Sequence, residues 1–353
     1  MERTKTLKKI FAVSDIHGCA TALRAALDGA GFDPKDPTHL LLVLGDLFDR
    51  GEENREVLAY LKGIRNKILI RGNHEDILLD SITTGNVGRL QMINGTLVTL
   101  AEFFPYYHGE SLINIIEPRQ RATAEMLTEL IMSMRDYFET DGYIFTHGWI
   151  TEDAGESDFR YATRGKWHNA RWLRWHKLYP HFEIPGGKTL VVGHTPAYYA
   201  SMFDHTRSDY DCSIFYGKGM IAIDGKASST GRVNVLVLED YVSEPVTHEL
   251  ALTDAEHTDL ARGKTRIHVR PFDSSSAELR VGDKIRFLDT GGANPITFVI
   301  NALHLYKDVY ELESEVYPYE LGSITTGDGT LTAHLKTAYP SGGNMPLLCI
   351  GLQ

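Results

Sequence analysis

The sequence predicts an α/β fold with helices covering the faces of the sheets. From Lys9 to Asp240, short β-type runs alternate with helix-like segments, as in layered α/β domains. The runs are β-branched and almost continuously apolar, which is typical of strands that are buried on both faces. The chain has 353 residues, with 42% hydrophobic and 24% charged residues, which suits a globular protein with one large core or two moderate ones.

The individual elements follow from this pattern. The predicted strands are Ile10–Ser14, Leu40–Leu44, Lys67–Ile70, Tyr143–Thr146, Leu190–Val192, Met220–Ile223 and Val233–Leu238. Between the first two strands, Cys19–Phe32 has helical apolar spacing and a glycine near its end. Residues 76–140 are rich in helix formers, and Thr123–Phe138 predicts an amphipathic helix. We expect a helical insertion here that shapes access of the substrate.

The pattern changes after about Glu239, and we place a domain boundary near Ser243. The predicted domains are therefore residues 1–243 and 244–353. The second begins with a helix-like segment at His248. The β-type runs RIHV, KIRF and ITFVI follow, separated by loops rich in Gly, Ser and Thr.

Charge and cysteine content restrict the classes of function. A net charge of −11 argues against nonspecific binding of polyanions by the whole molecule, although a local basic patch is compatible with it. No apolar run is long enough to span a bilayer, and the short run before SDIHG indicates a first strand rather than a signal peptide. Cys19, Cys212 and Cys349 are odd in number and far apart, so we expect a cytoplasmic protein without disulfides.

Ligand-type side chains follow successive strands at the point where each strand ends. They are Asp15 and His17 in SDIHG, Asp46 in GDLFDRG, Asn73 and His74 in RGNHE, His147 in THG, and His194 in GHTP. Sites in open α/β sheets lie at the carboxyl ends of the strands, so these groups should converge. Any one of the fifteen histidines could be an ordinary structural residue. A succession of five strand ends favours two divalent ions such as Mn, Fe or Zn.

These motifs, in this order, resemble those of the calcineurin-like metallophosphoesterases over about Lys9 to Asp240. GDLFDRG and GNHE resemble the phosphoprotein phosphatase branch, which includes bacterial protein phosphatases and symmetrical diadenosine tetraphosphatases. The resemblance implies a four-layer α/β/β/α sandwich that hydrolyses phosphoesters. GHTP lacks the second histidine of the GHxH motif, which disfavours the phosphodiesterase branches.

The resemblance also implies roles for the site residues. Asp15 and His17 would bind the first metal, Asp46 would bridge both, and Asn73, His147 and His194 would bind the second. Manganese is the expected metal, with iron or zinc as alternatives. A metal-bridging hydroxide would attack phosphorus directly.

Three further groups would act on the substrate. Arg50 would neutralise the phosphoryl oxygens, and His74, held by Asp49, would protonate the leaving oxygen. The alternative for Asp49 and Arg50 is an ordinary surface salt bridge. A second phosphate-binding arginine is expected among Arg160, Arg164, Arg171 and Arg174, and RWLRW favours Arg174. The alternative there is an aromatic helix whose arginines are only solvated.

The chain from about His248 resembles an ASCH domain, a small β-barrel related to PUA RNA-binding modules. Gly263 and Arg270 keep the register of the GxKxxExR motif, but Thr265 and His268 replace its lysine and glutamate. Residues 262–286 contain seven Lys and Arg against three Asp and Glu, so a small basic face that contacts RNA or a nucleotide is possible. The alternative is a structural or protein-contact module.

Three functions remain in competition at this point. The first is phosphomonoester hydrolysis of the Ser/Thr protein phosphatase type, acting on a phosphoprotein. The second is hydrolysis of a dinucleoside polyphosphate or an RNA end, guided by the C-terminal domain. The third is a non-catalytic nucleotide- or RNA-binding protein, which the full set of ligand types disfavours.

Overall fold

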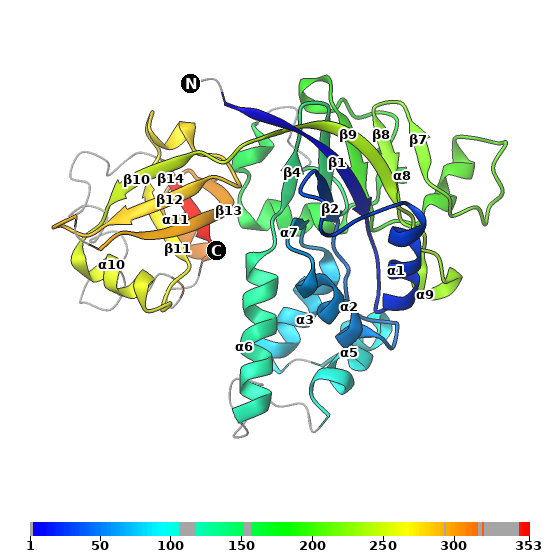
Figure 1. The fold of residues 1–353 in the computed structure, drawn as a ribbon, viewed down its shortest axis with the longest axis horizontal. Coiled ribbons are helices and arrows are strands. Elements are labelled where there is room, and N and C mark those ends of the chain that lie inside the picture. The colour runs from blue at the N-terminus through cyan, green and yellow to red at the C-terminus, as the bar shows by residue number, and fades with distance from the viewer. Residues whose placement is uncertain are drawn as a thin grey trace. The chain divides into compact units, whose positions relative to one another are not determined.

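A computed structural model describes residues 3–85, 87–105, 118–151, 157–292, 294–316, 320 and 346–353. The chain folds into two compact units (Figure 1). The larger unit comprises Lys5–Ile150 and His168–Val242, and the smaller comprises Met1–Thr4, Thr151–Trp167 and Ser243–Gln353. Residues 151–167 lie inside the predicted first domain but belong to the smaller unit.

The larger unit contains two sheets. One has the strand order β3-β2-β1-β9 and the other the order β4-β5-β6-β8-β7. The strands are β1 (Lys5–Val13), β2 (His39–Val43), β3 (Lys67–Leu69), β4 (Tyr137–Glu139), β5 (Tyr143–Thr146), β6 (Thr189–Val192), β7 (Phe215–Gly217), β8 (Met220–Ala222) and β9 (Leu236–Ser243). The pairs β1–β2, β2–β3, β5–β6 and β6–β8 are parallel, so these strands end at common edges.

Helices surround these sheets. The α-helices of the chain up to β9 are α1 (Ala20–Gly29), α2 (Asn54–Gly63), α3 (Asn73–Thr84), α4 (Arg89–Asn94), α5 (Thr96–Phe103), α6 (Pro118–Ser133), α7 (Arg164–Trp172), α8 (Trp175–Leu178) and α9 (Ala227–Thr230). Within residues 76–140, the segment predicted as a helical insertion, the described residues form most of α3 and all of α4, α5 and α6, followed by β4.

Alternate residues of β1 enter different cores. Ile10 and Ala12 pack with Phe145 of the second sheet, so the two sheets share one apolar layer. Phe11 and Val13 lie in another cluster, which contains residues of α1, α2, α3, α5 and α6. Both faces of β1 are therefore buried, and the predicted mixed α/β fold is confirmed.

Several element boundaries differ from the prediction. The helix predicted to reach Phe138 ends at Ser133, and Tyr137–Glu139 forms β4 instead. Strand β7 was not predicted at all. The last strand of the larger unit begins at Leu236 rather than Val233.

The smaller unit is built on one sheet with the order β10-β12-β13-β14-β11. Its elements are β10 (Thr247–Ala251), α10 (Asp254–Ala261), β11 (Ile267–Pro271), β12 (Lys284–Leu288), β13 (Ile296–Tyr306), α11 (Val309–Glu315) and β14 (Leu347–Leu352). The prediction that a helix starts at His248 is wrong. This residue lies in β10, and the helix begins at Asp254.

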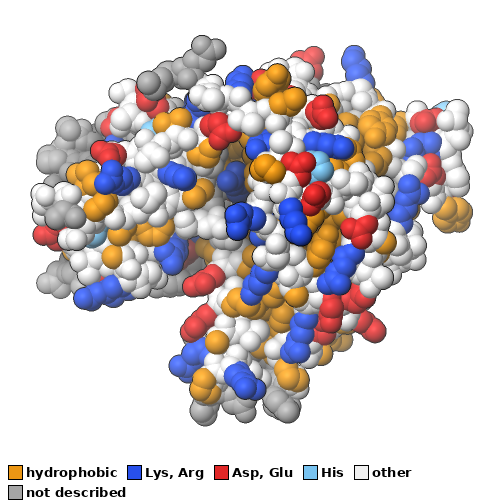
Figure 2. All heavy atoms as spheres, viewed as in Figure 1, with side chains coloured by type: hydrophobic (Ala, Val, Ile, Leu, Met, Phe, Trp, Pro, Cys, Tyr) orange, Lys and Arg blue, Asp and Glu red, His pale blue; other side chains and the backbone are white. Residues whose placement is uncertain are grey.

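Charged side chains of both signs are interspersed on the visible face of each unit (Figure 2). Among the residues that the structure describes, no helix is both long and apolar enough to cross a bilayer.

Candidate metal centre

The carboxyl ends of five strands of the larger unit deliver the predicted ligand residues. Asp15 and His17 follow β1, Asp46 follows β2, Asn73 and His74 begin α3 after β3, His147 follows β5, and His194 follows β6. Two groups have ligand atoms within 4.8 Å of one another. They are His17, Asp46 and His74, and Asp46, His147 and His194. Asp46 belongs to both groups, which is the position expected of a bridging carboxylate.

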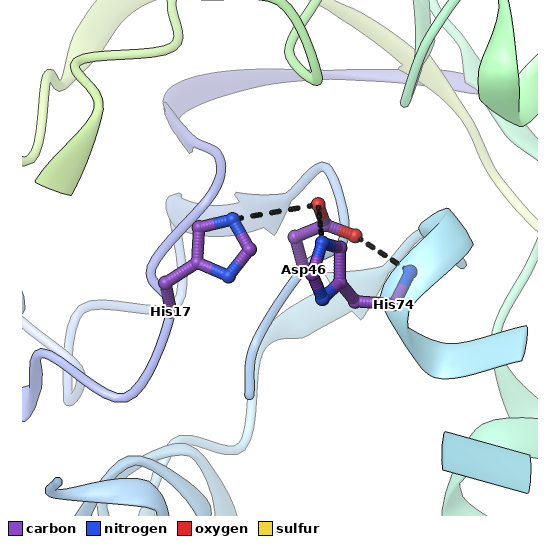
Figure 3. A group of neighbouring side chains, drawn as sticks. All are labelled: His17, Asp46 and His74. Atoms are coloured by element: carbon purple, nitrogen blue, oxygen red, sulfur yellow. Dashed lines mark hydrogen bonds and ion pairs between the residues drawn. The ribbon is translucent and has the colours of Figure 1, made fainter. Parts of the chain in front are cut away.

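The first group is centred on one oxygen of Asp46. The Nε2 atom of His17 lies 3.6 Å from Asp46 Oδ2 and 4.0 Å from Asp15 Oδ1. The Nδ1 atom of His17 is 2.9 Å from the carbonyl oxygen of Phe48, to which it donates, so Nε2 keeps its lone pair. Figure 3 shows the Asp46 carboxylate between the side chains of His17 and His74.

The second group uses the other oxygen of Asp46. His147 Nδ1 lies 2.6 Å from the carbonyl oxygen of Leu44 and donates its proton there. His147 Nε2 therefore presents a lone pair 2.9 Å from Asn73 Oδ1 and 3.4 Å from Asp46 Oδ1. His194 completes this group. A lone pair facing two oxygens is unfavourable unless a cation lies among them, so this donor set fits a divalent metal.

Burial determines the protonation of the cluster. It lowers the pKa values of His17 and His194 well below their ordinary range, which favours the neutral imidazoles that bind metals. It raises the pKa of Asp46 well above its usual range, and the charge of Asp15 adds to this effect. Buried carboxylates this close together favour a bound cation.

The backbone of the site is strained. Among the described residues, the non-glycine residues with positive φ are Asp15, His17, Asp46, Asp49, Arg50, His194 and Lys226. All of them except Lys226 are predicted site residues. Such conformations cost about 1–3 kcal/mol each and persist where the surrounding structure enforces them.

Glu75, the last residue of the GNHE motif and one given no predicted role, holds the loop that carries Asp46. Its buried carboxylate accepts hydrogen bonds from the backbone nitrogens of Asp46 (2.9 Å), Leu47 (2.8 Å) and Gly72 (2.8 Å). A Cβ atom at Gly72 would collide with Asp46 Oδ1, so only glycine allows this close approach. The GNHE motif therefore also holds the backbone of the GDLFDRG motif in place.

Asp49, His74 and Arg50 form one hydrogen-bonded group beside the candidate ligands. His74 Nδ1 is 2.7 Å from Asp49 Oδ2, which leaves His74 Nε2 directed toward Arg50 Nη2 at 3.0 Å. Arg50 Nη1 is 2.8 Å from His17 Nε2. Burial raises the pKa of Asp49 to about 6. The guanidinium and His74 Nε2 thus face the same place as the metal-ligand atoms.

The arginine candidates separate into free and paired ones. Arg174 is exposed, and no hydrogen bond or ion pair joins its side chain to another described residue. Its charge lowers the pKa of His194, which places it near the second ligand group. Arg171 is instead buried between Asp76 (2.7 Å) and Asp136 (2.8 Å). Its guanidinium is therefore occupied.

The remaining two candidates lie in the smaller unit. Arg160 pairs with Asp158 at 3.0 Å, and Arg164 with Glu320 at 2.9 Å.

One further buried carboxylate was missed in the sequence. Asp224 follows β8 and lies close enough to Asp15 that the charge of Asp15 adds to burial in raising the pKa of Asp224. The end of the MIAI run was the available signal, since Asp224 follows a predicted strand as the other candidates do.

The chain is similar in sequence to known phosphatases. The sequence model described as calcineurin-like phosphoesterase matches residues 8–221. Serine/threonine-protein phosphatase 1 of Salmonella typhimurium strain LT2 is 28% identical over 192 residues, which cover 54% of this chain and 81% of that protein. The symmetrical bis(5'-nucleosyl)-tetraphosphatase of Pseudomonas entomophila is 34% identical over 116 residues, or 31% of this chain and 39% of that protein.

Among solved structures, the cold-active protein-tyrosine phosphatase of a Shewanella species aligns with a TM-score of 0.41 and 17% identity. The alignment covers 66% of this chain and 76% of that one.

Proposed function

Because the chain belongs to the calcineurin-like phosphoesterase family, we propose that it hydrolyses phosphomonoesters with two divalent cations, in the manner of a Ser/Thr protein phosphatase. The observation that carries this proposal is the convergence of Asp46 with the imidazoles of both ligand groups. The protein phosphatase of Salmonella, which aligns over 81% of its length, supports the choice of substrate class.

The metal assignments in this proposal are those expected from the sequence. Asp15 and His17 would hold the first cation, Asp46 would be shared by both, and Asn73, His147 and His194 would hold the second. Bound there, manganese or another divalent cation would supply Lewis acidity toward the phosphoryl group and acidify a water. Imidazole nitrogens with carboxylate and amide oxygens, and no thiolate among these residues, suit such a cation.

The chain's own groups then act on the substrate. Arg50 donates to the phosphoryl oxygens through its two Nη atoms, which already point into the site. His74, oriented through Nδ1 by Asp49, gives a proton from Nε2 to the leaving oxygen. Arg174, which has no side-chain partner among the described residues and whose charge acts on His194, adds a second positive charge for the phosphate.

The test is turnover of a phosphoserine peptide and of diadenosine tetraphosphate with Mn²⁺, with Asp46→Asn as the blank. We expect the peptide to be preferred. Asp46→Asn should lose at least about 100-fold, since changes outside the ligand shell alone cost about 10–100-fold. Full metal-dependent activity in Asp46→Asn would refute the proposal.

A second candidate is hydrolysis of a dinucleoside polyphosphate, favoured by the 34% identity to the tetraphosphatase of Pseudomonas entomophila. The matched region spans only 39% of that protein. Preference for diadenosine tetraphosphate in the same assay would establish it.

We also propose that residues 244–353 form an ASCH/PUA-like module attached to a four-layer α/β/β/α phosphoesterase in the cytoplasm. The VGD segment supports this, because Val281–Asp283 lead directly into β12, and Asp283 accepts hydrogen bonds from the backbone nitrogens of Val246 (3.0 Å) and Arg280 (3.1 Å). Thr265 and His268 are buried, so an RNA or nucleotide contact would use exposed cations such as Arg266 instead. If Arg266→Glu leaves binding of a 5'-phosphorylated oligoribonucleotide unchanged, that contact is refuted.

A further inference from the structure

Helix α5 of the insertion begins against the loop that carries Asp49 and Arg50. Its first turn contains Thr96 and Thr99, both completely buried. Thr96 Oγ1 donates to Asp49 Oδ2 at 2.8 Å, and Thr99 Oγ1 donates to Asp49 Oδ1 at 2.7 Å. Each oxygen of the carboxylate therefore has a hydroxyl donor from α5.

The hydrogen bonds around Asp49 have fixed directions. Its backbone nitrogen donates to Thr99 Oγ1 (2.9 Å) and to Asn54 Oδ1 (3.0 Å). Because Thr99 Oγ1 accepts this proton, its own hydrogen is free to bond Asp49 Oδ1. Asp49 Oδ2 accepts hydrogen bonds from both Thr96 Oγ1 and His74 Nδ1. Rotation of the carboxylate would break all three side-chain contacts.

The helix is also fastened on either side of these threonines. Gly95, with φ of 83°, accepts a hydrogen bond from the backbone nitrogen of Arg50 at 3.4 Å, and a Cβ atom there would lie 2.8 Å from that nitrogen. At the other end of α5, Glu102 accepts from Asn54 Nδ2 (2.5 Å) and from the backbone nitrogen of Arg55 (3.1 Å).

The behaviour of these hydroxyls is unusual for a helix. Thr84 in α3 bonds back to the carbonyl oxygen of its own helix, Asp80 O, at 2.7 Å, which is the ordinary alternative for threonine. Thr96 and Thr99 bond instead to a side chain 47 and 50 residues earlier. Thr84, which is exposed, therefore serves as the control for loss of a threonine hydroxyl elsewhere on the insertion.

We propose that Thr96 and Thr99 are positioning residues that orient the Asp49 carboxylate so that His74 presents Nε2 to the leaving oxygen. The inference rests on the proposed phosphomonoester hydrolysis. In that reaction water forms the new bond to phosphorus and the bond from phosphorus to the leaving oxygen breaks. His74 gives its Nε2 proton to that oxygen, and the proton that the attacking water loses replaces the one that His74 gave up. The insertion is then part of the proton-delivery apparatus.

The leaving group distinguishes this role from simple support of the fold. A leaving oxygen that is stable as an anion needs little help from an acid, whereas a basic one depends on it. The experiment compares 4-nitrophenyl phosphate with phenyl phosphate as substrates of the full-length chain. The variants are Thr96→Val, Thr99→Val and the double variant, with Thr96→Ser and Thr99→Ser as conservative rescues and Thr84→Val as control.

We expect kcat of the double variant to fall about 10-fold or more with phenyl phosphate, and about 2-fold or less with 4-nitrophenyl phosphate, given the 10²–10⁴-fold range of acid catalysis. The serine variants should recover most of the loss, and Thr84→Val should match wild type on both substrates. Equal losses on the two substrates, or no loss, would overturn the inference while leaving phosphoester hydrolysis intact. Wild-type protein that is inactive on both, or Asp46→Asn that is fully active, would instead refute the proposed function. If the double variant does not fold, the single variants and their serine counterparts give the same comparison.

Discussion

Glu75 accepts a hydrogen bond from the backbone nitrogen of Asp46 at 2.9 Å, so a buried carboxylate outside both ligand groups fixes the residue that those groups share. The same side chain also accepts from Leu47 and Gly72. The position of Asp46 is therefore set by α3 as well as by β2.

Replacing Glu75 by glutamine should loosen this loop. The amide keeps one oxygen, so at least one of the three N–H donors would face an NH₂ group and lose its acceptor, at a cost of about 1–3 kcal/mol. We expect a lower free energy of unfolding and reduced metal content, measured by denaturant titration and elemental analysis. Glu52→Gln, at an exposed site, is the control. Unchanged metal content in Glu75→Gln would show that Asp46 does not depend on it.

Metal stoichiometry should separate the two ligand groups. Wild-type protein reconstituted with Mn²⁺ should retain two equivalents, whereas His194→Gln should retain about one, because His194 belongs only to the second group. Inductively coupled plasma mass spectrometry after gel filtration measures this. His181→Gln, an exposed histidine, should keep both. Two tightly held equivalents in His194→Gln would remove it from the ligand set.

Stability at acidic pH should depend on Asp76. The guanidiniums of Arg171 (2.7 Å) and Arg71 (2.6 Å) hold the pKa of this buried carboxyl far below its ordinary value, despite the opposing effect of burial. A pKa that is lower in the folded state stabilises the fold above the unfolded value of about 3.9, and this contribution disappears as the pH falls below it.

The Asp76→Asn variant tests the direction of this pH dependence of stability. At neutral pH the variant should lose about 3–5 kcal/mol, because the buried Arg171 loses its main partner. Its free energy of unfolding should also change less than that of wild type between pH 5 and about pH 3. Denaturant titrations across this range measure both effects, with Asp209→Asn, at an exposed site, as the reference. A wild-type acid dependence retained in Asp76→Asn would contradict the assignment.

Arg174 should affect binding of substrate. Its exposed side chain has no partner among the described residues, so replacement by glutamine should not disturb the fold. Loss of a charge-assisted hydrogen bond to phosphate predicts a KM raised about 10-fold or more, with partial recovery in Arg174→Lys. Steady-state kinetics with the phosphoserine peptide provides the measurement. Lys177→Gln, exposed in the same helix region, is the comparison, and an equal KM in the two variants would exclude a phosphate contact by Arg174.

The sequence was sufficient to predict the α/β fold and the strand ends that carry the candidate ligands. Long apolar runs such as Leu40–Leu44 mark buried strands clearly, and the residue that follows is then fixed at the edge of the sheet. Strands β4 (YFE) and β7 (FYG) have three residues each and contain no aliphatic run like MIAI in β8, so no continuous apolar signal marked them. In β10 (THELA), exposed residues alternate with partly buried ones and three of the five are polar, so no apolar run indicated a strand.

The supporting contacts could not be predicted for a different reason. Thr96 and Thr99 reach Asp49 across 47 and 50 residues of chain, and Asp76 meets Arg171 across 95. Hydroxyls and ion pairs of this kind carry no periodic signal. Their partners are set by the packing of helices that the pattern locates only within a few residues.

The smaller unit is not a contiguous piece of chain, and this limits how it could be inherited or exchanged. The chain leaves the larger unit at residue 151, contributes residues 151–167 to the smaller unit, and returns to the larger unit at residue 168. Thr163 and Gly165 in that excursion bond to Glu315 at 3.0 and 2.9 Å, and the carbonyl oxygen of Ala162 lies 2.8 Å from His304 Nδ1. Recombination at residue 243 would separate these partners, so the C-terminal region is not a cassette. Any successful transplant would have to carry the excursion with it.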